Sequence, residues 1–109
     1  MKRRYDLYFN DILESTKRIK EYYKSETDEM MIDAILRNLE IIGEAVTQLP
    51  EDVKIKYNNI AWRDIQDFRI VVAHHYWKVN LNIVWDIVEN KIPLLEKQIK
   101  EIMKKEKIN

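Results

Sequence analysis

The scarcity of turn-forming residues is the strongest constraint on how this chain can fold. Only one glycine, Gly43, and two prolines, Pro50 and Pro93, occur among its 109 residues. A sheet protein needs many tight turns, and those turns depend on glycine and proline at defined positions. Long helices joined by a few short connections do not need them. The sequence therefore predicts an all-α fold, and its length predicts one domain over residues 1–109.

The spacing of apolar residues agrees with this prediction. They recur three and four residues apart over four main segments, at about 4–23, 27–49, 61–75 and from 80 to the end. Pro50 suits the first turn of a further short helix at about 51–57. We therefore expect an antiparallel bundle of four to five helices.

The ends and breaks of these helices are also suggested by the sequence. Ser25 or Thr27 is the expected N-cap of the second helix, and Asn80 is the expected N-cap of the last. Because the helical phase continues across Pro93, we expect a kink or a short break there. The charged tail, residues 100–109, is expected to fray.

The second helix carries apolar residues on two sides, so it needs two partners. One partner is the rest of the bundle, and the other could be a second subunit. Asn38 lies on one apolar stripe, between Ile35 and Ile42. A polar residue at such a position usually forms a hydrogen bond inside a core or across an interface.

Composition excludes several classes of function. The chain has no cysteine, which rules out disulfides, thiolate metal sites and cysteine nucleophiles and fits a cytoplasmic protein. No apolar run approaches the ~18 residues of a membrane span.

The 19 basic and 19 acidic residues balance, so any contact with RNA is expected in a local cleft and not over a broad basic face. No glycine-rich phosphate loop and no metal site is expected, because adjacent His74 and His75 diverge by about 100° on a helix.

One segment gathers reactive side chains, including both histidines of the protein. Arg69 offers a permanently charged planar fork that matches a phosphate, and His74 can exchange a proton near neutral pH. Cleavage of RNA without a metal needs both properties, since a base must take the ribose 2′-hydroxyl proton and a cation must neutralise the transition state.

Helix geometry tests whether these two side chains can act together. Tyr76 is seven residues from Arg69 and nearly eclipses it, whereas His74 is five residues away and points roughly 140° from it. Either the helix ends near Ala73 and redirects His74, or the site combines Arg69 of one subunit with His74 of another. The structural alternatives are a helix-end hydrogen bond for His74, core packing for Tyr76 and a surface pair between Arg69 and Asp64 or Asp67.

At these residues the sequence resembles the HepT-like family of the HEPN superfamily. The motif is Arg-x4-His-x-Tyr, here Arg69, His74 and Tyr76. Three flanking stretches share the resemblance, which covers nearly the whole chain: 37–45 in the second helix, 60–65 before the motif, and 83–88 with 92–95 after it.

The resemblance implies a helical homodimer with the motif in a cleft at the interface. It implies a metal-independent endoribonuclease without a cofactor, acting as the toxin of a type VII-like toxin–antitoxin pair. Arg69 and His74 would be catalytic, and Tyr76 would position substrate. The implied partner is a minimal nucleotidyltransferase of the MntA type, which would silence the toxin by adding AMP to Tyr76. Such a group would block and partly neutralise an RNA cleft.

The residues expected to support the motif are Asn38, Glu44 and Ile70. The family usually has a polar residue, commonly asparagine, where this chain has Ile70. Loss of one orienting hydrogen bond would cost ~1–3 kcal/mol, roughly 10- to 100-fold in rate. The alternative functions are a non-catalytic dimer that binds nucleotide or RNA and docks a nucleotidyltransferase, and a plain dimerisation scaffold.

Overall fold

The computed structural model describes residues 5–24, 26–75 and 80–108, without the side chains of 74 and 75, and these residues contain helices and no strand. The helices are α1 (Tyr5–Tyr22), α2 (Glu29–Gln48), α3 (Glu51–Lys56), α4 (Trp62–Gln66), α5 (Phe68–His75), α6 (Leu81–Asp86), the π-helical turn η1 (Ile87–Lys91) and α7 (Ile92–Lys105). The all-α prediction is therefore confirmed.

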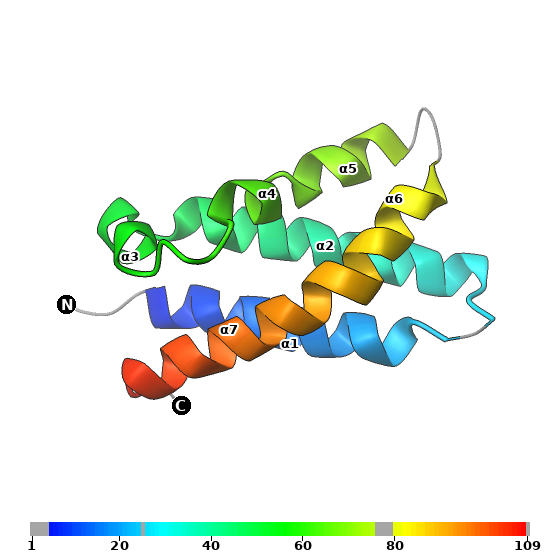
Figure 1. The fold of residues 1–109 in the computed structure, drawn as a ribbon. Coiled ribbons are helices and arrows are strands. Elements are labelled where there is room, and N and C mark those ends of the chain that lie inside the picture. Colours follow the sequence, from blue (N-terminus) through cyan, green and yellow to red (C-terminus); the bar gives the residue numbers. More distant parts are fainter. Residues whose placement is uncertain (1–4, 25, 76–79, 109) are drawn as a thin grey trace.

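The helices form a bundle built around α1 and α2, which lie antiparallel (Figure 1). The segment from α6 to α7 is one bent rod whose second half packs on α1, and α4 and α5 follow each other along α2. Large apolar side chains fill the space between these elements, including Phe9, Ile12, Leu39, Ile42, Ile92 and Ile99, all fully buried. No helix of the described residues is long and apolar enough to cross a membrane.

Most of both apolar stripes of α2 is covered within the chain. Ile35 and Ile42 of one stripe and Leu36 and Val46 of the other are all buried. The partners of α2 are α1 on one side and α4 with α5 on the other. The two-sided pattern is therefore satisfied by intramolecular packing and does not require a second subunit.

The start of α2 differs from the expected cap. Asp28 is the N-cap, and its carboxylate accepts a hydrogen bond from the Met31 amide at 2.8 Å. Thr27 instead bridges Lys24, accepting from its amide at 3.2 Å and donating to its carbonyl at 2.7 Å. Ser25 lies outside the described residues. An acid at this position suits the positive end of the helix dipole.

The helix predicted over 61–75 is two helices, α4 and α5, separated at Asp67. This residue has a ψ of −4°, well away from the usual helical value, and its amide donates to the carbonyl of Arg63 at 3.0 Å. The break falls where α2 packs closely against this segment, since Gly43 lies against both Gln66 and Arg69.

The last helix behaves as expected at its start and at Pro93. The Asn80 side chain accepts a hydrogen bond from the Asn82 amide at 3.1 Å. The turn before Pro93 is π-helical, with the Ile92 amide bonded to the carbonyl of Ile87. A proline ring clashes with the carbonyl four residues earlier, so a widened turn accommodates it without ending the rod.

The tail does not fray as predicted. Helix α7 continues to Lys105, and Ile102 and Met103 are buried. The Ile108 amide then bonds to the Met103 carbonyl at 2.8 Å, and Glu106 accepts hydrogen bonds from Lys56 and Tyr57 of the α3 region. Apolar residues at helical spacing therefore outweigh the many charges between them.

Candidate active site

Arg69 lies at the closest approach of α5 to α2. A methyl group added to Gly43 would overlap Arg69 Cγ and lie 3.0 Å from the carbonyl oxygen of Gln66. Only a residue without a side chain lets the two backbones approach this closely. Gly43 therefore fixes the position of the Arg69 stem against α2.

The guanidinium of Arg69 is held at two points and remains reachable from solvent. Its Nε donates to the carbonyl of Gln66 at 3.3 Å, and its Nη1 lies 3.3 Å from Glu44 Oε2. The side chain is 36% exposed, and that of Glu44 is 58% exposed. The surface pair predicted with Asp64 or Asp67 is therefore replaced by one with Glu44. An exposed pair contributes only ~0–1 kcal/mol, so a phosphate can compete for this guanidinium.

The backbone of α5 continues in helical form through His75. The expectation that the helix ends near Ala73 is therefore wrong. On a continuous helix, the Cα–Cβ direction at His74 lies roughly 140° around the axis from that at Arg69. The His74 side chain and the whole of Tyr76 lie outside the described residues, so their roles stay predictions.

Asn38 does not join the Arg69 cluster. Its Nδ2 donates to the carbonyl of Ala34 at 2.8 Å, within its own helix. Its Oδ1 is buried and has no hydrogen-bond partner among the described residues. Asn38 is five residues before Gly43, which places it about 140° around α2 from the contact with α5.

Ile70 follows Arg69 directly and is 47% exposed. It presents an aliphatic side chain beside the cation, at the position where a polar side chain was expected to orient the site. The structure thus brings Glu44 to Arg69, with Ile70 next to it in the chain, and leaves Asn38 apart.

Sequence reasoning missed two parts of this arrangement. The carbonyl of Gln66 is free to accept from Arg69 because the helix is interrupted at Asp67, which no residue pattern indicated. Gly43 was noted only as an isolated glycine, although a glycine inside a helical pattern often signals close packing of two backbones. Among the described residues, no three His, Asp or Glu side chains converge as metal ligands would.

Comparison with known proteins adds to this geometry. The model of the family described as "Ribonuclease HepT-like" matches residues 12–102. A Methanocaldococcus jannaschii protein named "Putative RNase" is 43% identical over 103 residues, covering 89% of this chain and 85% of that protein. The "Probable ribonuclease HepT" of Thermococcus cleftensis is 32% identical over 110 residues, covering 95% of this chain and 100% of that protein.

A longer relative, also from M. jannaschii, is named "Gamma-glutamylcyclotransferase and putative RNase". It is 37% identical over 109 residues, and the match covers 94% of this chain but 49% of that protein. The chain therefore spans about half the length of this relative. No solved structure gave a significant match.

Proposed function

Because this chain belongs to the HepT-like ribonuclease family, we propose that it is a metal-independent endoribonuclease that acts as the toxin of a toxin–antitoxin pair. The observation that carries the proposal is the placement of Arg69. Its guanidinium is positioned by a backbone carbonyl and by the close packing at Gly43, and its only charged partner among the described residues is an exposed carboxylate.

In the proposed reaction, His74 takes the proton of a ribose 2′-hydroxyl. The 2′-oxygen then forms a bond to phosphorus, and the bond from phosphorus to the 5′-oxygen of the next nucleotide breaks. The leaving oxygen receives a proton from an imidazolium, and the products are a 2′,3′-cyclic phosphate and a free 5′-hydroxyl. Arg69 stabilises the negative charge that develops on the phosphorus oxygens.

The proposed site combines two chains of a homodimer. The support is the continuous backbone of α5, which directs His74 and Arg69 of one chain to different sides of the helix. A two-fold axis can bring Arg69 of one protomer and His74 of its partner to one phosphate.

Mixed dimers test this arrangement directly. Arg69→Ala and His74→Ala chains are expected to be inactive alone. When they are unfolded and refolded together, half of the dimers are mixed, and each mixed dimer holds one intact composite site. The mixture should then recover about a quarter of wild-type cleavage. No recovery, in a mixture shown to exchange subunits, would mean that both residues act from one chain.

Regulation by a partner is part of the proposal. We propose that an MntA-type minimal nucleotidyltransferase transfers AMP from ATP to the hydroxyl of Tyr76, with release of pyrophosphate, and so silences the toxin. Co-expression with such an enzyme should raise the intact mass by one or more AMP units, and Tyr76→Phe should abolish the increase. An unchanged mass would remove this regulation and leave the nuclease proposal standing.

A non-catalytic dimer that binds nucleotide or RNA and docks a nucleotidyltransferase is the second candidate, favoured by the exposed Ile70 beside Arg69. Ile70→Asn separates the two. A gain of roughly 10- to 100-fold in cleavage would indicate a nuclease that lacks one orienting hydrogen bond. Binding without cleavage in both forms would favour the second candidate.

A further inference from the structure

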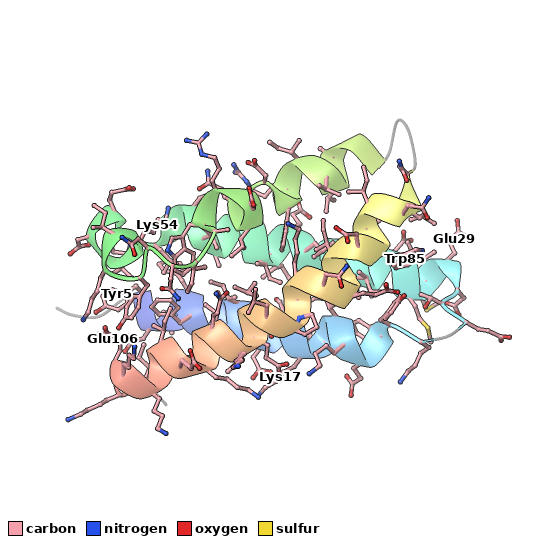
Figure 2. The ribbon with its side chains drawn as sticks, viewed as in Figure 1. Tyr5, Lys17, Glu29, Lys54, Trp85 and Glu106 are labelled. Carbon is pink, nitrogen blue, oxygen red and sulfur yellow. The ribbon has the colours of Figure 1, made fainter. Side chains whose placement is uncertain are left out.

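A pocket of about 470 Å³ lies between α3, α4 and the segment that joins them. We call it the α3–α4 pocket. Its lining includes the cations Lys54 and Arg63, the amides Asn58 and Gln66, and the aliphatic residue Ile55. Figure 2 shows Lys54 at the end of the bundle where Tyr5 and Glu106 also lie.

The walls of the α3–α4 pocket are fixed by hydrogen bonds. The indole of Trp62 is buried, and its Nε1 donates to the carbonyls of Lys54 and Tyr57 at 3.2 and 3.0 Å. The Trp62 amide also donates to the carbonyl of Ile60 at 2.8 Å. The start of α4 is thereby anchored to the end of α3, so a ligand would lose little free energy in ordering the pocket.

The pocket adjoins the proposed catalytic arginine. Gln66 lines it, and the carbonyl of the same residue accepts the hydrogen bond from Arg69 Nε. Arg63 lies on α4, before the break at Asp67, and Arg69 lies on α5 just after it. A strand of RNA whose scissile phosphate contacts Arg69 can therefore continue into the pocket.

The charges of the pocket favour an anion. Lys54 and Arg63 form no ion pair with any residue that the structure describes, whereas Lys56 beside them is paired with Glu106. Among the described residues, Glu51 is the single acid in the lining, so these residues together carry a net positive charge. These cations match the phosphate of a nucleotide. The apolar side chains match the face of its base, and the amide side chains match the hydrogen-bonding edge of the base.

We propose that the α3–α4 pocket binds an unpaired nucleotide of the RNA substrate, next to the phosphate that Arg69 holds. Lys54 and Arg63 contact its phosphate, Ile55 and Ile60 lie against its base, and Asn58 and Gln66 contact the base edge. The ligand is single-stranded, because a duplex would keep the base stacked and paired. This assignment rests on the proposed ribonuclease function and adds that the enzyme selects single-stranded RNA as its substrate.

RNA binding in a His74→Ala background tests the pocket apart from catalysis. Fluorescence anisotropy with a labelled single strand of mixed sequence should give a Kd about tenfold higher for Lys54→Ala/Arg63→Ala. The slope of log Kd against log salt should fall by about 0.7, because the contact with one phosphate is lost. Lys97→Ala/Lys104→Ala on α7 is the control, since it removes two exposed charges from residues that do not line the pocket.

A second pair of variants keeps both cations. Ile55 is 64% exposed, so Ile55→Glu and Ile55→Gln are expected to fold. The carboxylate should raise the Kd for single-stranded RNA more than the neutral amide does, because the amide removes only the apolar contact with the base whereas the carboxylate also repels the phosphate. In chains that retain His74, the Lys54→Ala/Arg63→Ala change should raise KM and leave kcat within about twofold.

Each result bears on one of the two proposals. If the Lys54→Ala/Arg63→Ala variant has the same Kd and salt slope as the α7 control, the proposed role of the pocket is wrong. An equal loss for a duplex of the same length would also overturn it, leaving only a general basic surface. If the wild-type protein cleaves no RNA but the substitutions in the pocket still raise the Kd for single-stranded RNA, the ribonuclease proposal is wrong and the pocket proposal stands.

Discussion

At the scale of single residues, Gly43 determines how near α2 lies to Arg69, the cation of the proposed active site. Helix propensity favours alanine over glycine at this position by about 1 kcal/mol. The contacts oppose it, because the new methyl group would meet the Gln66 carbonyl and the stem of Arg69. The backbone oxygen cannot move without shifting α4 or α5, so packing is expected to outweigh propensity.

Gly43→Ala is therefore predicted to lower the free energy of unfolding by about 1–3 kcal/mol and to reduce RNA cleavage. Urea unfolding and a cleavage assay measure the two effects. Glu44→Ala is the control, since it removes the ion pair without changing the helix spacing and should cost under about 1 kcal/mol. An alanine variant more stable than wild type would show that α2 and α5 separate without strain.

At the scale of the elements, the sequence predicted helix type and approximate extent well, because apolar spacing alone determines both. It predicted the junctions less well. The break at Asp67 depends on how closely α2 approaches, and the ordered end of α7 depends on Glu106 meeting α3. Both are contacts between residues distant in the chain. Likewise, the sequence suggested Glu44 as a residue that supports the motif, but it did not identify Glu44 as the ion-pair partner of Arg69.

The π-helical turn before Pro93 is a testable junction. Such a turn resembles an α-helix with one added residue, so deleting the exposed Asn90 should restore an α-helix with the same buried faces. Pro93 would then lie within that helix, at a cost of about 3 kcal/mol. We predict that Pro93→Ala recovers most of the stability lost on deletion, as measured by urea unfolding. If the effects of the Asn90 deletion and of Pro93→Ala on the free energy of unfolding simply add in the double variant, the prediction is wrong.

At the scale of the whole molecule, Glu96 joins α7 to α1. Its Oε1 lies 2.6 Å from Lys20 Nζ, and its Oε2 lies 3.5 Å from Lys100 Nζ. Burial raises the pKa of the Glu96 carboxyl, but the hydrogen bond and charge of Lys20, with a smaller contribution from Lys100, outweigh burial and leave the pKa below the ordinary value of 4.5 for a glutamate. The ionised carboxylate therefore stabilises the folded state.

Because the folded pKa is depressed, this stabilisation is present above about pH 4.5 and is lost as the pH falls through the folded pKa. Glu96→Gln should lower the free energy of unfolding by about 1–2 kcal/mol at pH 7. The difference from wild type should shrink as the pH falls below 4.5. Urea unfolding across this range measures it, and a difference that stays constant would assign the effect to packing.

The first and last described helices also meet at one end of the molecule. Tyr5 and Glu106 lie near each other beside α3 (Figure 2), and Glu106 is bonded to Lys56 and Tyr57. The segment from Tyr5 to Glu106 is therefore suited to circular permutation, in which a short linker joins these two residues and new termini open between α1 and α2. Such a permuted chain would carry a fusion partner at the opposite end of the bundle from the α3–α4 pocket, leaving that pocket unobstructed.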